Sequence, residues 1–206
     1  ICYADPSMLG ILKSPGSMGF DIVVSEGQSM GSSLSFGGPT VGWFATRKEL
    51  ARLVPGRIIG ESRDSNNTKT YVMTLRAREQ DIRREKASSN ICTNQTLNAV
   101  GSTIHLSWLG PEGLYEIGYQ AIQKASYMKQ ALIENGFTVL NNNTSLREFL
   151  IQTKRLAEDV ILEMGSKGFL AGIKYSDNEI LIAVTEKRTR EQIDNYVESL
   201  MEVDNA

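Results

Sequence analysis

Cysteine and histidine are scarce in this sequence, with Cys2 and Cys92 as the two cysteines and His105 as the one histidine. Two cysteines give no disulfide framework, and a single histidine excludes metal sites built on several histidines, so no metal site is predicted. A Ser-His-Asp or Cys-His catalytic arrangement would have to use His105, which lies within an expected helix and is predicted to be structural. Cys92 is interpreted as a small buried residue at a helix start, with a reactive thiol as the alternative.

The chain also lacks a strong excess of either charge. Its 22 basic and 24 acidic residues give a formal net charge of −2, which argues against nucleic acid as the main partner. No apolar run approaches the roughly 20 residues that a membrane span requires, and no signal peptide is visible. Together with the scarcity of cysteine, these absences favour a cytoplasmic protein without a membrane partner.

The patterns that are present indicate a β-rich part, two long helices and a compact α+β part. In the β-rich part we expect strands at residues 1–5, 20–26, 41–46 and 70–77, a short helix at 47–54 and a polar turn region at 61–70. Residues 1–5 are expected to be buried, and the continuous apolar run at 20–26 predicts a strand that is covered on both faces. Because the chain begins inside an apolar run and without an initiator methionine, we interpret it as a fragment of a longer polypeptide.

Two long helices are predicted from about residue 91 onward. A first apolar face is formed by Leu97, Val100, Ile104 and Trp108. Gly110-Pro111 is expected to end the first helix and open the second, whose stripe runs from Leu114 to Leu132 before a glycine cap at Gly136. The remaining segments predict the order ββαββα, with strands at 137–140, 147–153, 169–175 and 179–186. A capping box formed by Thr189 and Gln192 opens the last helix.

The densest charge run occupies residues 76–86. Its basic residues are Arg76, Arg78, Arg83, Arg84 and Lys86, and its acidic residues are Glu79, Asp81 and Glu85. If the run is helical, Glu79 and Arg83 form a favourable i,i+4 pair, and a solvated helix is the simpler interpretation. Arginine also suits carboxylate, phosphate or protein-interface contacts, so an interface segment is the alternative.

A polar stretch at 87–95 separates this charge run from the first long helix. Ser88, Ser89, Asn90 and Thr93 are all residue types that can cap a helix, and a helix N-terminus also attracts phosphate. The two roles are compatible. A loop at 27–42 carries five glycines, but it does not have the G-x-G-x-x-G pattern and precedes a strand, so a tight turn is favoured over a dinucleotide site.

Several stretches of the sequence resemble the P protein of the glycine cleavage system, namely EGQSMGSSLSFGGPTVGWFATRKE, PGRIIGE, LRAREQDIRREKASSNICTNQ, LGPEGL and AVTEKRT. The resemblance covers nearly the whole chain. More narrowly, it is to the N-terminal half of that protein, which in many bacteria and archaea is a separate subunit 1, and it implies a C-terminal fragment of that subunit. The implied fold is α/β, of the type I pyridoxal-phosphate-dependent transferase-like class. Residues 1–110 would be the end of the large domain with the start of the connecting helices, and residues 111–206 the connecting helix and the small C-terminal α+β domain.

The resemblance also implies an activity, that of glycine dehydrogenase (decarboxylating), an oxidoreductase of glycine catabolism. This enzyme decarboxylates glycine on pyridoxal phosphate and passes the aminomethyl group to the lipoyl arm of the H protein. Active members of the fold carry a lysine that holds the cofactor covalently, and the equivalent residues here, 25–39, contain no lysine. The resemblance therefore implies a non-catalytic subunit of a heteromer, in which P protein subunit 2 holds the cofactor and this chain binds none covalently.

In type I folds the segment before the long helix commonly reaches the partner's cofactor phosphate. By that resemblance, Ser88, Ser89, Asn90 and Thr93 become candidates for phosphate contacts, and the five basic residues of 76–86 become an interface segment. Two alternatives stay open. One is a self-sufficient pyridoxal-phosphate enzyme that uses Lys86 or Lys13, and the other is a purely structural interaction subunit.

Overall fold

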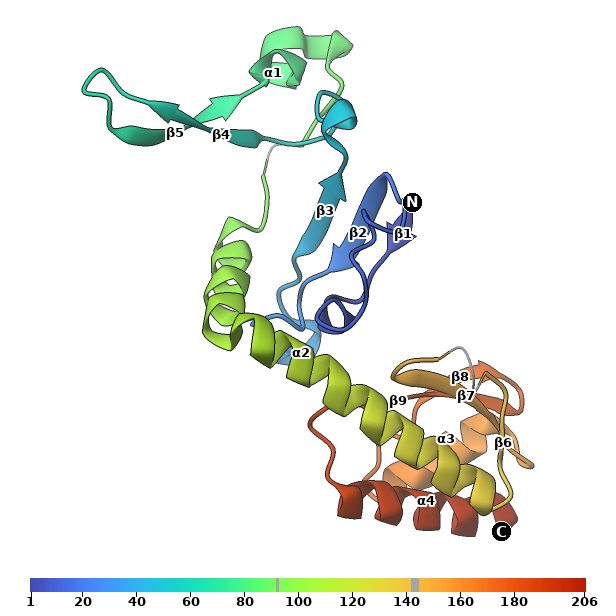
Figure 1. The fold of residues 1–206 in the computed structure, drawn as a ribbon. Helices are drawn as coiled ribbons and strands as arrows, with labels where there is room; N and C mark the ends of the chain where they lie inside the picture. Colours follow the sequence, from blue (N-terminus) through green and yellow to red (C-terminus); the bar gives the residue numbers. More distant parts are fainter. Residues whose placement is uncertain (92, 142–144) are drawn as a thin grey trace. The chain divides into compact units, whose positions relative to one another are not determined.

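The computed structural model describes residues 1–91, 93–141 and 145–206, and its internal contacts divide the chain into two units, Ile1–Gly110 and Pro111–Ala206. Figure 1 follows the chain through both. Each unit has its own secondary structure.

The N-terminal unit contains a three-stranded sheet. Its central strand β2 (Ile22–Glu26) pairs in parallel with β1 (Cys2–Tyr3) and antiparallel with β3 (Gly42–Thr46). The strands predicted near 20–26 and 41–46 are confirmed. The expected burial is wrong, because the side chain of Tyr3 on the edge strand β1 is 71% exposed and β2 is half-buried along its whole length rather than covered on both faces. Short 3-10 turns η1 (Pro6–Met8) and η2 (Ser35–Gly37) lie in the connections.

A hairpin follows, formed by β4 (Ile58–Arg63) and β5 (Lys69–Thr74) in antiparallel register. The expected turn region at 61–70 is too long, since its first three residues belong to β4. Asp64 sets the turn itself, because its Oδ1 accepts hydrogen bonds from the N–H groups of Asn66 at 2.8 Å and Thr68 at 2.9 Å. The helix expected at 47–54 is reduced to one 3-10 turn, η3 (Lys48–Leu50).

Helix α2 (Thr96–Glu134) carries a break at Gly110, whose φ of 64° and ψ of −178° are not helical. Pro111 follows directly and begins the second helical segment, as the sequence predicts. Leu97, Val100, Ile104 and Trp108 are exposed in the N-terminal unit, with the Trp108 side chain at 85%. The predicted apolar stripe therefore has no covering segment among the described residues.

His105 on α2 packs against the glycine loop of the same unit. Gly31 has a φ of +102°, and a Cβ added there would lie 2.7 Å from the Cβ of His105 and 3.0 Å from the carbonyl oxygen of Gly101. Only glycine permits this close approach in the left-handed region. The contact agrees with a structural role for His105.

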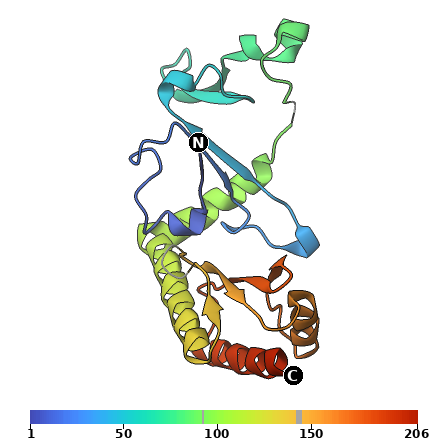
Figure 2. The same ribbon diagram turned by 90° about the vertical axis from the view of Figure 1, so that its right-hand side faces the viewer.

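The C-terminal unit has the predicted ββαββα order after α2. Its elements are β6 (Thr138–Val139), β7 (Glu148–Gln152), α3 (Ala157–Ser166), β8 (Ile173–Ser176), β9 (Glu179–Ala183) and α4 (Arg190–Asn205). The strands form an antiparallel sheet in the order β6-β7-β9-β8. Helices α3 and α4 lie with the second part of α2 on one face of this sheet (Figure 2).

The core of this unit follows from the alternation along its strands. On β7, Phe149 and Ile151 are fully buried against the helices, whereas Glu148 and Gln152 point away. Helix α4 begins with the predicted capping box, in which the Thr189 Oγ1 accepts from Gln192 N at 3.2 Å and the Gln192 side chain accepts from Thr189 N at 3.1 Å. Gly136, at φ +87°, ends α2 as expected.

Candidate functional site

The charged segment after β5 forms short turns instead of one helix. These are η4 (Arg76–Arg78), α1 (Gln80–Arg83) and η5 (Arg84–Lys86). Leu75 at φ 56° and Arg84 at φ 52° are in the left-handed region and interrupt any continuous helix. The expected Glu79–Arg83 pair is not among the ion pairs of the described residues. The buried Glu79 carboxylate instead lies 3.9 Å from the Nε of Arg57.

Ser89 is buried, with 6% of its surface exposed, and it connects two distant parts of the N-terminal unit. Its Oγ accepts hydrogen bonds from the N–H of Gly56 at 3.0 Å and from the N–H of Ile91 at 3.4 Å. Its backbone forms a parallel bridge with Glu79. Of the four predicted phosphate-contact residues, Ser89 is the one whose side-chain oxygen is already engaged inside the chain.

Arg78 is also used inside the chain. Its Nη2 donates to the carbonyl oxygen of Gly56 at 2.8 Å and its Nε donates to that of Leu75 at 3.2 Å. Its own carbonyl oxygen accepts from the N–H of Ser88 at 3.1 Å. Gly56 and Arg57 are thus part of this region, and sequence reasoning missed them, because the Pro55-Gly56 turn lies 33 residues before Ser89.

The other three candidate contact residues, Ser88, Asn90 and Thr93, are exposed. Helix α2 begins at Thr96, and the first carbonyl that accepts an i+4 hydrogen bond is that of Gln95, from Ala99 N at 3.0 Å. The prediction that Ser88, Ser89, Asn90 or Thr93 caps this helix is therefore wrong, because all four residues lie before its N-cap position. Cys92 lies outside the described residues.

The remaining basic residues differ in how far they are neutralised. Arg76 Nη2 lies 3.0 Å from Asp81 Oδ2 in an exposed ion pair. Arg83, Arg84 and Lys86 are exposed, and their side chains form no ion pair with another described residue. The first turn of α2 contains no acidic residue. The segment before α2 thus combines hydroxyl and amide donors with uncompensated positive charge, which is the chemistry of an anion site.

The glycine loop between β2 and β3 is closed at its base by the Glu26 side chain and by one backbone hydrogen bond. The Oε1 of Glu26 accepts from Gln28 N at 2.9 Å and from Val41 N at 3.0 Å, and Gly27 N donates to Val41 O at 2.8 Å. The tight turn that the sequence predicts is at the start of the loop, where Met30 N donates to the carbonyl oxygen of Gly27 at 2.9 Å. The nearest lysines considered as cofactor-holding alternatives, Lys13 and Lys86, are both at the surface.

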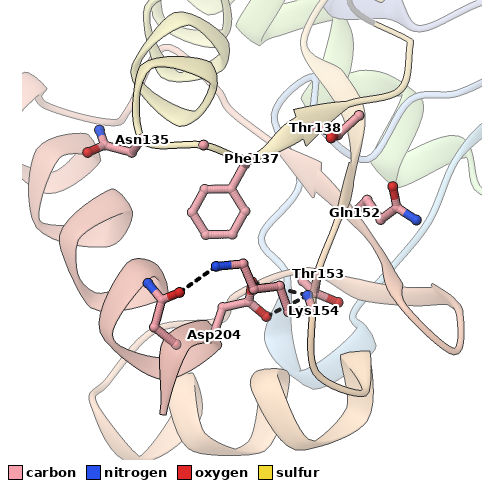
Figure 3. Close-up of a pocket in the computed structure, with 9 residues that line it drawn as sticks. Asn135, Phe137, Thr138, Gln152, Thr153, Lys154 and Asp204 are labelled. Carbon is pink, nitrogen blue, oxygen red and sulfur yellow. Dashed lines mark hydrogen bonds between the residues drawn. The ribbon is translucent and has the colours of Figure 1, made fainter.

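The C-terminal unit contains a pocket of about 250 Å³ between the ends of α2 and α4 and the end of β7 (Figure 3). Its charged groups already have partners. The buried Asp204 carboxylate accepts from the backbone N–H groups of Lys154 and Arg155, and Lys154 Nζ donates to Asn205 Oδ1 at 2.6 Å. We therefore do not place the functional site in this pocket.

The described part of the chain holds no cluster of three or more His, Cys, Asp or Glu residues that could bind a metal ion. Within the same residues, no helix has the length and apolar character that crossing a bilayer would require.

Comparison with known proteins identifies relatives along the whole chain. A family profile described as glycine cleavage system P-protein matches residues 1–200. Probable glycine dehydrogenase (decarboxylating) subunit 1 of Staphylococcus haemolyticus is 44% identical over an alignment of 212 positions that covers 100% of this chain and 47% of that protein. The Staphylococcus aureus protein of the same name is 46% identical over an alignment of 211 positions, which again covers 100% of this chain and 47% of the relative. The chain thus spans about half the length of the curated relatives it matches.

Solved structures agree with these relatives. The inhibitor-bound crystal structure of glycine decarboxylase (P-protein) of the glycine cleavage system superposes with a TM-score of 0.92 at 38% identity, covering 98% of this chain and 47% of that one. An apo cysteine desulfurase from Thermococcus onnurineus superposes with a TM-score of 0.64 at 13% identity, covering 98% of this chain and 52% of that one, and shows a shared fold. The predicted fold class, type I of the pyridoxal-phosphate enzymes, is confirmed. The chain belongs to the glycine cleavage system P-protein family.

Proposed function

We propose that this chain is part of subunit 1 of a glycine dehydrogenase (decarboxylating). The proposed activity of the assembled enzyme is decarboxylation of glycine on pyridoxal phosphate, followed by transfer of the aminomethyl group to the lipoyl arm of the H protein. The relatives named above support this proposal along the whole chain. In keeping with it, we propose a cytoplasmic heteromer in which P protein subunit 2 is the partner and glycine is the substrate.

Within that enzyme we propose a non-catalytic role for this chain. Pyridoxal phosphate supplies the electron sink for decarboxylation when it is bound, and in this proposal the partner subunit holds it covalently. Residues 25–39 contain no lysine. Lys13 and Lys86 are at the surface, where nothing excludes water from an amine. These observations support the non-catalytic role over a self-sufficient enzyme that uses either lysine.

The single observation that carries the site proposal is the exposure of Ser88, Asn90 and Thr93 directly before α2. Two hydroxyl groups and one amide, beside a helix start without acidic residues, fit a phosphate group chemically. We propose that these three contact the phosphate of the partner's cofactor. Ser89 belongs to the same proposal, but it acts by holding the backbone, since its oxygen is engaged with Gly56.

For the subunit interface, we propose the basic segment that carries Arg76, Arg78, Arg83, Arg84 and Lys86. Arg83, Arg84 and Lys86 are free to meet acidic groups on a partner, whereas Arg78 is committed within the chain. The exposed apolar stripe on α2 supports a role in a larger assembly, because contiguous apolar side chains are seldom left in water.

We further propose that residues 1–110 are the end of the large domain with the start of the connecting helices. Residues 111–206 would then be the connecting helix and the small α+β domain. The division of contacts between Gly110 and Pro111 supports this assignment.

The proposal is tested with Thr93→Ala in the full-length subunit, assembled with its partner. A hydrogen bond to a charged group contributes about 1.5–3 kcal/mol, so retention of pyridoxal phosphate should fall about one to two decades. Thr103→Ala is the matched control, because Thr103 is an exposed threonine two turns inside α2. Equal cofactor affinity in both variants would refute the proposed phosphate contact at Thr93.

The non-catalytic role has its own test, which is glycine decarboxylation by the isolated full-length subunit supplied with free pyridoxal phosphate. No turnover above a cofactor blank is expected until subunit 2 is added. An absorbance band of covalently bound cofactor in the isolated subunit, lost in Lys86→Ala or Lys13→Ala, would favour the self-sufficient alternative. Activity of subunit 2 without this chain would favour a purely structural subunit.

A further inference from the structure

The two ends of the candidate site are joined at one residue, Gly56, which uses both of its backbone polar groups. Its N–H donates to Ser89 Oγ at 3.0 Å, and its carbonyl oxygen accepts from Arg78 Nη2 at 2.8 Å. Gly56 therefore links Arg78, near the start of the charged segment, to Ser89, three residues after its end. We call Gly56, Arg78 and Ser89 the Gly56 latch.

The latch depends on the backbone conformation of Gly56. Its φ is +83°, in the left-handed region that favours glycine. The nearest atom to an added Cβ would be the Cδ1 of Ile91 at 4.0 Å, an ordinary contact. A side chain at this position would therefore be resisted by the backbone angle and not by lack of space.

Further contacts close the same connection. The N–H of Ser88 donates to the carbonyl oxygen of Arg78 at 3.1 Å, and Glu79 bridges to Ser89 in parallel. The Glu79 side chain is buried, with Arg57, the residue after Gly56, as its ion-pair partner at 3.9 Å. Residues 78–79 and 88–89 are thus held side by side at the Pro55-Arg57 turn.

This geometry separates two kinds of residue in a segment whose charges look alike in the sequence. Arg83 is exposed and has no ion pair among the described residues, whereas two guanidinium nitrogens of Arg78 donate hydrogen bonds to backbone carbonyl oxygens. Lysine can replace it only in part, because a single ammonium lacks the planar fork that reaches the carbonyls of Leu75 and Gly56 together.

We propose that Arg78 and Gly56 are positioning residues of the anion site before α2. They fix the backbone at Ser88 and Ser89, and so present Ser88 and Asn90 in one arrangement, without touching the anion themselves. The proposal rests on the phosphate contact proposed above and extends it to residues that lie behind the contact surface.

The test uses the full-length subunit assembled with its partner and compares Arg78→Ala and Arg78→Lys with the control Arg52→Ala, because Arg52 is an exposed arginine outside the proposed interface segment. Amide hydrogen exchange of Gly56 and Ser88 reports the latch independently of the cofactor. Loss of hydrogen bonds to a charged group should speed this exchange about tenfold to a hundredfold in Arg78→Ala, with a smaller effect for Arg78→Lys and none for Arg52→Ala. Retention of pyridoxal phosphate should fall in the same order.

A second pair of variants keeps the test usable if Arg78→Ala does not fold. Gly56→Ala is compared with Gly19→Ala, because Gly19 also has a left-handed φ, of +96°, and open space around its Cβ position. Both substitutions carry a similar backbone penalty, but only Gly56→Ala should speed exchange at Ser88 and release cofactor.

The outcomes separate the latch from the function on which it rests. Unchanged exchange at Gly56 and Ser88 in Arg78→Ala would overturn the latch. Faster exchange with normal cofactor retention, while Thr93→Ala loses cofactor, would overturn the positioning role. Faster exchange with cofactor retained in every variant, Thr93→Ala included, would remove the phosphate contact itself and with it the positioning role, but would leave the latch as a structural element.

Discussion

The buried carboxylate of Asp204 provides a quantitative test of what holds the C-terminal unit together. Asp204 lies near the end of α4, and 4% of its surface is exposed. Its carboxylate oxygens accept from Lys154 N at 2.9 and 3.1 Å and from Arg155 N at 3.2 Å. These bonds tie the last turn of α4 to the connection between β7 and α3 (Figure 3).

The cost of Asp204→Ala follows from those two donors. Each hydrogen bond to a charged acceptor contributes about 1.5–3 kcal/mol, and the adjacent pocket lets water reach the freed N–H groups, which favours the lower value. We therefore expect the unit's opening free energy to fall by about 3 kcal/mol, or more than a hundredfold in the opening equilibrium constant. Asp204→Asn keeps one acceptor oxygen without charge and should lose about half as much.

Amide hydrogen exchange of β7, β9 and α4 measures this opening directly. Asp177→Ala is the control, because its exposed carboxylate has only a surface ion pair with Lys174 at 3.6 Å, and such pairs contribute about 0–1 kcal/mol. Equal exchange in the Asp204→Ala and Asp177→Ala variants would refute the assignment of Asp204 as a structural acceptor.

Three further predictions concern single contacts. Burial raises the pKa of Tyr196 above its ordinary value near 10, so above that pH the folded state keeps a proton that the unfolded state loses. The free energy of unfolding of the C-terminal unit should therefore be constant below about pH 10 and fall by about 1.4 kcal/mol per pH unit above it. A Tyr196→Phe variant measured by denaturant titration should lack that decline. Thr189→Ala removes half of the capping box and should cost about 1 kcal/mol by the same titration, with no change as the contrary result. Gly31→Ala should destabilise the N-terminal unit by about 1–3 kcal/mol in thermal melts. If the clash with the His105 Cβ is part of the cause, the same substitution should cost less in a His105→Gly background, which lacks that atom.

Local signals in the sequence predict most of the C-terminal unit. The Thr189-Gln192 capping box, the glycine cap at Gly136 and the alternation on β7 each depend on residues within four positions of one another. Because such short-range patterns carry their own physical cause, they are sufficient to predict the order ββαββα.

The N-terminal unit is harder to predict because its decisive contacts are not local. Serine is a common residue in helix caps and phosphate sites, yet the Oγ of Ser89 accepts a hydrogen bond from the N–H of Gly56, 33 residues earlier. The second half of strand β4, Glu61–Arg63, is predicted as a turn because it is polar, yet it pairs with Lys69–Tyr71 of β5. No periodicity within either segment could show these pairings.

The division of the chain at Gly110 gives it a built-in optical label. Both tryptophans, Trp43 and Trp108, belong to the N-terminal unit, and the C-terminal unit has tyrosines but no tryptophan. Fluorescence excited at the red edge of the indole band therefore follows the N-terminal unit alone, while tyrosine absorbance in the near ultraviolet weighs both units. Denaturation curves recorded with the two signals on one sample would show, without an added dye or a mutation, whether the two units unfold together or one after the other.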